Sequence, residues 1–455
     1  MVSRRLALTA LGTVPVAASL AIPMGATAAT VERAHRHMAG NLDLDQLPVV
    51  DSHMHPIGRK LISQAYAGLM GDFVKVLVPP GEYAGKSDLL AHARAGVNDL
   101  VMSAPRRTAY FNYIARTYGV APTIEGFDSV VSKHIASDAE FQSYVKTVFD
   151  RERIATVVLQ AAEPAPTPPA TLIPPDRYVW TTVISEMTRL RWIKAQGLTS
   201  LTDAVAAIDR ILESAVERGA RGFKNMSAYY RTLGLTRPSQ PEAEAALHRV
   251  LKAAPSADSP EPPGPMDPNP TFADPADNAA LTTLEDYLFR HIYIKAGRLR
   301  RPIIIHSAVA LHPALRADYN DPHPLYAIFI DPEIQRAETR FVIIHAGYPN
   351  TELIAAFISQ FPNVYTDVSF YSKYPGTLLQ VYRDLLALGP SDHIMHGSDA
   401  NSVPEEIGSC AWNSRAVLAK VLTEYLDLGW TQGDINKMAE DVLHRTARTV
   451  FGIET

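Results

Sequence analysis

Several histidines and one aspartate come directly after short apolar runs, where their side chains could bind a metal ion. His53 and His55 follow such a run, and the two-residue period of a strand would place both imidazoles on one face. His306 and His345 each end a run rich in isoleucine, and Asp399 follows another apolar run. Imidazole and carboxylate are ligands that suit Zn²⁺, Mn²⁺ or Fe²⁺. Each side chain alone could equally be a hydrogen-bonded buried histidine or a capping aspartate, so the prediction of a metal site rests on their recurrence.

The expected chemistry is metal-assisted attack by water. Three histidines and one carboxylate can hold a metal and leave a coordination position for water, and the metal makes that water a nucleophile at neutral pH. Asp399 could both ligate the metal and accept a proton from the attacking water, then pass it to the leaving group. These residues predict a hydrolytic centre with a divalent transition metal, zinc being the expected ion and one or two ions the expected number.

Lys224 follows another short apolar run and has three candidate roles. It could be carboxylated and bridge two metal ions, remain a cation that binds a substrate carboxylate, or pair with a neighbouring acid. Tyr229, Tyr230 and Arg231 follow it closely in the chain. They favour an anionic substrate, because arginine can hold a carboxylate through two hydrogen bonds and tyrosine adds a hydroxyl donor. The alternative is a surface arginine stacked on a tyrosine.

The elements that must position these residues are short β-branched runs, which alternate with helical patterns from residue 45 onward, as in parallel βα units. Eight such runs predict an α/β fold of the (β/α)8 TIM-barrel type. No Gly-x-Gly-x-x-Gly turn follows the first run, as a dinucleotide-binding open sheet would show. In a closed barrel, Asp399 would lie beside the histidines of the first run, with His306 and His345 on the opposite wall. The runs are Val49–His55, Ile154–Gln160, Val179–Ser185, Gly222–Met226, Pro302–His306, Phe341–His345, Val364–Val368 and His393–His396.

Two insertions interrupt the predicted barrel, which spans residues 45–453. Residues 56–153 separate the first two runs and should form a helical insertion over the barrel mouth. Residues 253–278, before the fifth run, are rich in Pro, Asp and Ser and should form a loop that is mobile or is ordered only by packing on its neighbours. Thr431–Phe451 predicts a closing helix that begins at a capping threonine and stops at Gly452. Within the first insertion, helical periodicity covers Leu61–Val74 and Ser103–Tyr118.

The first 30 residues have the pattern of an export signal. Arg4 and Arg5 precede an apolar run over residues 6–24, and small residues at 26–28 form a cleavage-type site. The paired arginines favour the bacterial twin-arginine route, which carries folded proteins, whereas an ordinary secretory signal is the alternative. We therefore expect an exported protein, in the periplasm or outside the cell. The run is too short and too interrupted to predict a membrane span, and no other candidate is present.

The composition is that of a globular enzyme. Of 455 residues, 47% are hydrophobic and 20% are charged, which allows a large core and excludes a wholly disordered chain. A net charge of −5 without a basic stripe argues against nucleic acid and favours a small-molecule substrate. The lone Cys410 permits no intramolecular disulfide and is expected to be buried in a helix. Barrels of this kind often pair through their outer helices, so a homodimer is one expected assembly.

Taken together, the motifs resemble the amidohydrolase superfamily, in its amidohydrolase-2 branch. The similarity extends over most of residues 45–453, and it looks closest to the amidohydrolase domain that is fused to glutamine-synthetase-like domains in fungal and plant proteins. The stretch after the tyrosines is one residue longer than the related pattern, which leaves the shape of the substrate pocket open. The matching segments are Asp51–His55, Gly222–Arg231, His306, His345–Pro349 and Gly397–Asp399.

The resemblance implies metal ligation by His53, His55, His306 and Asp399. It makes His345 a second-metal ligand or the group that polarises the substrate carbonyl, and Lys224 a bridging carbamate. The predicted function is hydrolysis of an amide, peptide-like or lactone bond in a substrate that bears a carboxylate. Nonoxidative decarboxylation of an aromatic or unsaturated acid is the alternative within the branch. A noncatalytic binding protein on a retained barrel is a further alternative, against which the intact histidine and aspartate set argues.

Overall fold

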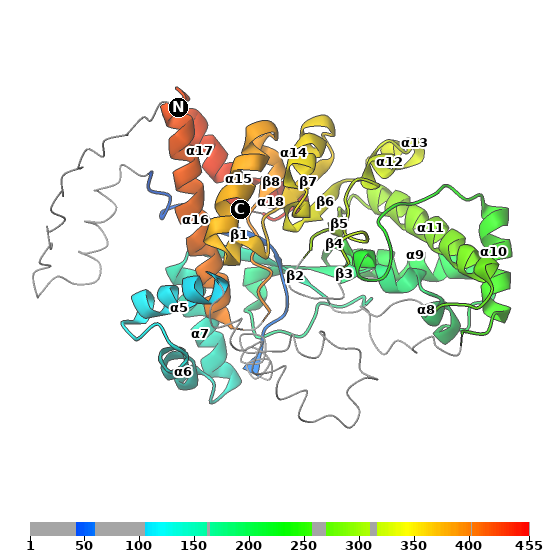
Figure 1. Ribbon diagram of the computed structural model, residues 1–455. Coiled ribbons are helices and arrows are strands. Elements are labelled where there is room, and N and C mark those ends of the chain that lie inside the picture. The colour runs from blue at the N-terminus through cyan, green and yellow to red at the C-terminus, as the bar shows by residue number, and fades with distance from the viewer. Residues whose placement is uncertain are drawn as a thin grey trace, which may run out of the picture. The chain divides into compact units, whose positions relative to one another are not determined.

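The computed structural model describes residues 42–59, 105–161, 164–256, 270–309, 316–401 and 403–454. These residues form an eight-stranded parallel sheet whose strands pair in sequence order, surrounded by helices (Figure 1). The predicted (β/α)8 barrel is confirmed, and each predicted run overlaps a strand whose ends differ from the prediction by at most two residues. The strands are β1 (Val49–Met54), β2 (Ile154–Gln160), β3 (Tyr178–Val183), β4 (Ala220–Asn225), β5 (Ile303–His306), β6 (Phe341–Ile344), β7 (Val364–Asp367) and β8 (Ile394–Met395).

Backbone hydrogen bonds join the segment after the last strand to the first strand. The N–H of Ser52 donates to the carbonyl of His396 at 2.9 Å. The N–H of Asp399 donates to the carbonyl of His53 at 2.8 Å. Gly397 lies at this seam, where a Cβ atom would come within 2.9 Å of Ser52 Oγ. Because glycine has no Cβ, the segment after β8 can approach β1 this closely.

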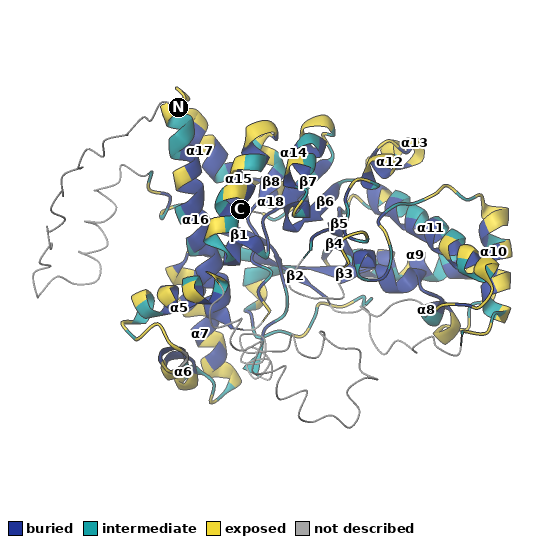
Figure 2. Cartoon of the chain, viewed as in Figure 1, coloured by how far each residue is buried: buried dark blue, intermediate teal, exposed yellow. Residues whose placement is uncertain are grey.

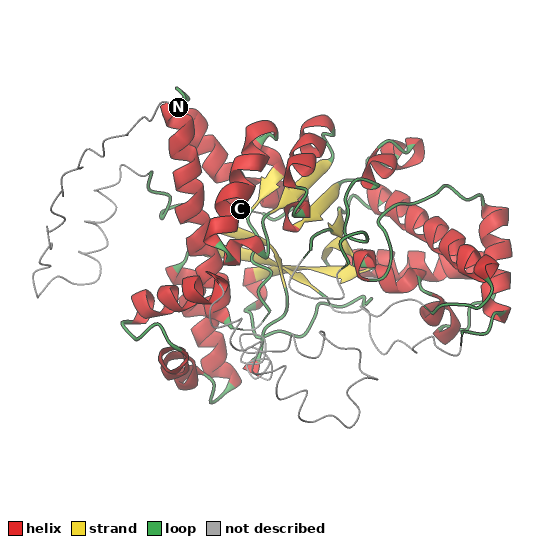
Figure 3. Ribbon diagram, viewed as in Figure 1, coloured by secondary structure: helices red, strands yellow, loops and turns green. Residues whose placement is uncertain are grey.

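The helices lie around the sheet, as Figure 3 shows, and several begin at a side-chain cap. Ser200, Ser239 and Asp274 each accept a hydrogen bond from a backbone N–H in the first turn of the helix that follows. The α-helices are α5 (Pro105–Tyr118), α6 (Ile124–Val131), α7 (Asp138–Arg151), α8 (Leu190–Ala195), α9 (Leu201–Glu217), α10 (Gln240–Lys252), α11 (Pro275–Arg298), α12 (Leu325–Phe329), α13 (Pro332–Arg336), α14 (Thr351–Gln360), α15 (Pro375–Leu388), α16 (Pro404–Asp427), α17 (Gln432–Glu440) and α18 (Thr446–Phe451). Short 3-10 turns that carry site residues are η5 (Ser227–Tyr229), η6 (His345–Gly347) and η7 (Tyr371–Lys373).

The described part of the first insertion contains α5, α6 and α7, which lie on one side of the barrel (Figure 1). Helix α5 covers residues 105–118 of the predicted helical segment Ser103–Tyr118. Helices α6 and α7 are not among the predicted elements, although Thr123 and Ser137 cap them and are local start signals. The predicted helix Leu61–Val74 and the expected export signal of residues 1–30 lie outside the described residues.

The second insertion ends earlier than predicted. An isolated antiparallel bridge joins Pro255 to Phe272, and residues 257–269 between them lie outside the described part of the chain. Helix α11 begins at Pro275, because Asp274 caps it and proline suits the first helical position. Residues 275–278 of the predicted loop are therefore helical.

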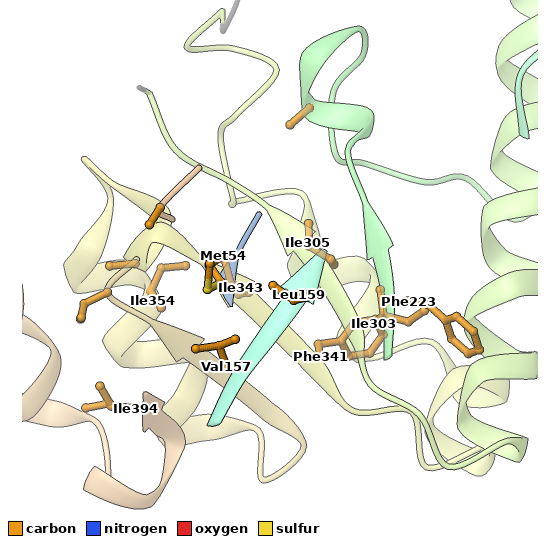
Figure 4. Close-up of a cluster of buried hydrophobic side chains, with 14 of the residues drawn as sticks. Met54, Val157, Leu159, Phe223, Ile303, Ile305, Phe341, Ile343, Ile354 and Ile394 are labelled. Carbon is orange, nitrogen blue, oxygen red and sulfur yellow. The ribbon is translucent and has the colours of Figure 1, made fainter. Parts of the chain in front are cut away.

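Alternate side chains of the strands divide the core into an outer and an inner layer. Outward side chains such as Phe223, Ile303 and Phe341 pack with the surrounding helices in one large buried cluster (Figure 4). The strands are buried, and the helices expose their outer faces (Figure 2). Inward apolar side chains form a smaller cluster with α18, which therefore closes the end of the barrel opposite the polar strand ends. This inner cluster comprises Val50, Val158, Ile304, Val342, Ile344, Met395, Ala447, Val450 and Phe451.

The C-terminal segment is helical with one irregular turn. Helix α17 begins after the predicted Thr431, whose side chain forms a capping box, and α18 ends at Gly452, which has a φ of 60°. Between these helices, Asp441–Arg445 form a π-helical turn that the prediction of a single α-helix lacks. The carbonyl of Val442 in this turn accepts the N–H of His396, so the irregular turn is tied to the barrel seam.

Two further expectations concern the lone cysteine and membrane spans. Cys410 is fully buried in α16, as predicted. None of the helices in the described ranges is long and apolar enough to cross a membrane.

Candidate metal centre

The first strand and the segment after the last strand bring three candidate ligands together. His53 lies near the end of β1, His55 follows that strand, and Asp399 follows β8. Asp399 Oδ1 lies 3.3 Å from His53 Nε2 and 3.2 Å from His55 Nε2. One ligand atom from each of the three residues lies within 4.8 Å of the other two. Barrel closure thus places the carboxylate beside the histidine pair.

Two further histidines face this group from β5 and the end of β6. His306 Nδ1 lies 3.2 Å from His345 Nε2, and the ring centroids of His345 and His53 are 5.4 Å apart. His306 is buried, and its Nε2 has no hydrogen-bond partner within the described residues. His345 has a φ of 63°, a conformation that residues other than glycine rarely adopt and that clusters at functional sites. The structure therefore brings all five predicted strand-end residues to one place.

Asp367, at the end of β7, holds His345 in position. Its Oδ1 accepts the backbone N–H of His345 at 2.9 Å and the hydroxyl of Ser369 at 2.5 Å. Its Oδ2 accepts the hydroxyl of Ser52 at 2.9 Å. Burial raises the pKa of this carboxyl. Asp367 is not among the predicted site residues, although it is a polar residue next to the end of the seventh predicted run, Val364–Val368, and is the last residue of β7.

Asp51 is a second buried carboxylate outside the set of predicted site residues, although it begins the segment Asp51–His55 that matches the family. Its Oδ1 accepts the N–H of Ser398 at 2.9 Å and the N–H of His53 at 3.2 Å. Burial raises the pKa of Asp51 to about 7. The side chain therefore spans the seam of the barrel and fixes the backbone on both sides of the candidate ligands.

Burial and hydrogen bonds together set the protonation states of the candidate ligands. Burial and the nearby Lys224 lower the pKa of His53 to about 3, and burial lowers the pKa of His306 and His345 well below the usual value. Burial raises the pKa of Asp399, but hydrogen bonds with His53 and His55 outweigh it and hold that pKa well below its ordinary value. Neutral imidazole and ionised carboxylate are the forms that bind metal. The donor set, including the unpartnered nitrogen of His306, therefore fits a divalent transition metal.

Lys224 and Tyr229 lie beside these residues. Lys224 is buried in β4, and burial lowers its pKa to about 7, while the charges of Asp399 and Asp367 act in the opposite direction. The ring of Tyr229, in η5, lies over the ring of His306 with 4.7 Å between centroids. Burial thus favours the neutral amine of Lys224 over its cation.

Tyr230 and Arg231, predicted to bind substrate, have polar partners inside the protein. The hydroxyl of Tyr230 donates to the carbonyl of Ser185 at 3.1 Å. The guanidinium of Arg231 pairs with Glu285 at 3.0 Å and with Asp286, both buried on α11. The structure thus does not bring these two side chains into the histidine cluster. Their role in substrate binding stays a prediction that competes with these internal contacts.

Comparison with known proteins decides the family. The amidohydrolase model Amidohydro_2 matches residues 191–453. This chain belongs to that amidohydrolase family. The matched region of the amidohydrolase contains His306, His345 and Asp399, whereas His53 and His55 precede it. Protein fluG of Emericella nidulans is 24% identical over 196 residues, which are 40% of this chain and 22% of fluG. The match therefore spans about a fifth of that relative's length.

Solved structures share the fold of this amidohydrolase. One described as a metal-dependent hydrolase from Lactobacillus casei has a TM-score of 0.65 at 15% identity and covers 91% of this chain and 98% of its own. Uronate isomerase from Thermotoga maritima has a TM-score of 0.63 at 12% identity, with coverage of 90% and 95%. Glucuronate isomerase from Caulobacter crescentus has a TM-score of 0.59 at 12% identity, with coverage of 95% and 96%. At these identities the likeness shows the fold alone.

Proposed function

We propose that this amidohydrolase is a metal-dependent hydrolase that uses activated water to cleave an amide, peptide-like or lactone bond of a small molecule bearing a carboxylate. The observation that carries the proposal is the convergence of His53, His55 and Asp399, whose ligand atoms lie within 4.8 Å of one another. These residues, with His306, would hold the metal, and the nitrogen and oxygen donors favour zinc. When bound, such a metal supplies Lewis acidity and makes water nucleophilic at neutral pH.

Asp399 is the general base of this proposal. Its carboxylate stays ionised at neutral pH, because hydrogen bonds with His53 and His55 hold its pKa well below the ordinary value against the opposing effect of burial. It is therefore able to accept the proton of the attacking water and return it to the leaving group. Its side chain is 19% exposed, which leaves it within reach of a molecule that enters the barrel mouth.

The hydrogen bonds around His345 support a ligand role for this residue. The hydroxyl of Ser369 donates to Asp367, so Ser369 Oγ is the acceptor for His345 Nδ1, 2.8 Å away. A proton on Nδ1 leaves the lone pair of His345 Nε2 directed at His306 and the centre of the site. This arrangement favours the second-metal role of His345 over hydrogen-bond donation to a substrate carbonyl.

Lys224 supplies either a bridging carbamate or a cation for the substrate carboxylate. Its pKa of about 7, lowered by burial, supports the carbamate role, because only the neutral amine takes up carbon dioxide. A carbamate would add an anionic bridge between two metal ions, whereas an ammonium would bind the anionic substrate directly. Tyr229, which lies over His306, is the one predicted tyrosine placed to contact a substrate in either case.

Two other reactions compete with hydrolysis. Nonoxidative decarboxylation of an aromatic or unsaturated acid would use the same metal ligands, with Asp399 or a histidine protonating the carbanion. Isomerisation of a carboxylate-bearing sugar is a second candidate, and its support is the shared fold of the uronate isomerase, which covers 90% of this chain. The three reactions differ in what they do to the mass of the substrate, so one measurement distinguishes them.

The test incubates the metal-loaded full chain with a panel of N-acyl amino acids, dipeptides, lactones, aromatic acids and uronates in isotopically labelled water. Hydrolysis adds one water to the substrate, and the oxygen of that water carries the label into the products. Decarboxylation releases carbon dioxide, and isomerisation leaves the mass unchanged. Carbon dioxide release in proportion to turnover, or turnover at constant mass, would refute the hydrolase proposal.

Substitution of Asp399 links that activity to the metal centre. Asp399→Asn keeps the shape of the side chain but removes its charge, and we expect turnover to fall by about 10²- to 10⁴-fold and bound metal to be lost. The matched control is Asp392→Asn, whose carboxylate is 58% exposed near the start of β8. Equal metal content and turnover in Asp399→Asn and the unsubstituted protein would contradict the proposal.

A further inference from the structure

Asp399 has a backbone conformation that the surrounding residues must support. Its φ is 56°, in the left-handed region that residues other than glycine seldom adopt. Its N–H is held by the carbonyl of His53 at 2.8 Å. Its carbonyl accepts a hydrogen bond from Lys373 Nζ at 2.6 Å. Because the direction of the side chain follows from the backbone, these two bonds set the place of the Asp399 carboxylate.

Lys373 is itself held in one position. It lies at the end of η7, is 6% exposed, and its ammonium is 3.0 Å from Glu406 Oε1 and 5.6 Å from the ring centroid of Phe370. A buried cation requires a charged or hydrogen-bonding partner. Glu406 provides the charge from the first turn of α16, where a carboxylate is also favoured by the helix N-terminus.

Glu406 connects Lys373 to two further parts of the chain. Its Oε1 pairs with Arg106 of α5 at 2.7 Å, which ties it to the first insertion. Its Oε2 accepts the N–H of Asn401, two residues after Asp399, at 3.2 Å. The loop between β8 and α16 is therefore held at the Asp399 carbonyl by the lysine and two residues later by the glutamate.

We propose that Lys373 and Glu406 are positioning residues of the metal centre. The ammonium of Lys373, fixed by Glu406, holds the carbonyl of Asp399 and thereby orients the Asp399 carboxylate toward His53 and His55. The inference rests on the proposed function, since it concerns the same metal centre. The hydrogen bond of Lys373 is to the backbone carbonyl of Asp399, so the pair acts on the metal centre by placing Asp399.

The test titrates the metal-free full chain with Co²⁺ alone, whose visible absorption reports the geometry of its ligands. Lys373→Met keeps the length of the side chain but removes the charge and the donor, and we expect Co²⁺ to bind about tenfold or more weakly with an altered spectrum. Lys373→Arg keeps a cationic donor and should bind closer to the unsubstituted protein. The matched control is Lys146→Met, which removes an exposed lysine paired with Asp150 and should change neither quantity.

Each outcome supports or overturns the inference. An unchanged Co²⁺ affinity and spectrum in Lys373→Met overturns it. If Lys373→Met does not fold, Glu406→Gln takes its place, because it removes the partner charge at nearly constant shape, and it must show the same loss. If the unsubstituted protein binds no Co²⁺, the proposed function fails and the inference with it. A failure of the positioning role alone therefore has a different result from a failure of the metal centre.

Discussion

Replacing Arg231 with methionine tests whether this arginine stabilises the fold or binds substrate. Its side chain is 11% exposed and contacts Glu285 and Asp286, which are 3% and 2% exposed. At an effective dielectric constant of about 20, an ion pair separated by about 3 Å is worth roughly 5.5 kcal/mol before desolvation is counted. Removing the cation of Arg231 leaves two buried carboxylates without its compensating charge, and this loss destabilises the folded state by about 3–5 kcal/mol. We expect the free energy of unfolding of Arg231→Met to fall by this amount.

The assay is urea unfolding followed by circular dichroism, with the dependence on urea concentration compared between variants. Arg249→Met is the matched control, because Arg249 also contacts two carboxylates, Asp274 and Asp277, but is 45% exposed. Such exposed pairs contribute about 1 kcal/mol or less. If Arg231→Met is as stable as the unsubstituted protein but loses turnover, the structural role is refuted and the substrate-binding role predicted from the sequence stands.

Two further predictions concern helix α18, which closes one end of the barrel, and the acid stability of the protein. Phe451→Ala, in the inner cluster, should lower the free energy of unfolding by about 3–5 kcal/mol. The control Leu428→Ala, at a 77% exposed position, should change that free energy by about 0.5 kcal/mol or less. If urea unfolding gives similar values for the two variants, the packing of α18 in the barrel end is contradicted. Burial raises the pKa of Asp331, but hydrogen bonds from Arg290 and the α13 backbone outweigh it and lower that pKa. The stability that the ionised Asp331 carboxylate gives the folded protein is fully present above the unfolded pKa of about 3.9. It is lost as pH falls through the lower pKa of the folded state. Between about pH 5 and pH 2, Asp331→Asn should therefore lose less stability than the unsubstituted protein, as measured by urea unfolding at each pH. An equal loss of stability in both proteins over this range would contradict the prediction.

The strands were predictable from the sequence because their signals are local. Ile303–Ile305 form an apolar run that is buried in the structure, and His306 ends it at the barrel mouth. Strands that are covered on both faces show such continuous apolar runs, and a polar residue at the end of each run marks the change from core to site. The prediction of His53, His55 and Asp399 as neighbours followed from the strand count, since a closed barrel places its last strand beside its first.

Some helices and helical irregularities were less predictable from the sequence than the strands. Helix α7 was missed although Ser137 caps it, because its apolar positions lie within a long insertion whose packing partners are not evident from the chain. The π-helical turn at Asp441–Arg445 was also missed, since the carbonyl of Val442 is used by His396, a residue of the barrel seam. Such a contact depends on how the C-terminal helix docks.

The sequence by itself determined which side chains stand at the strand ends, and with them the family and the candidate ligands around Asp399. Only the tertiary structure decided where the remaining charges go. Arg231 meets Glu285 at a separation of 54 residues, and Lys373 reaches the Asp399 carbonyl from a different strand end. The physical reason is that a buried charge must be neutralised or hydrogen-bonded by whatever the fold brings next to it. Spacing along a strand predicts which face a residue occupies, but it does not predict that partner.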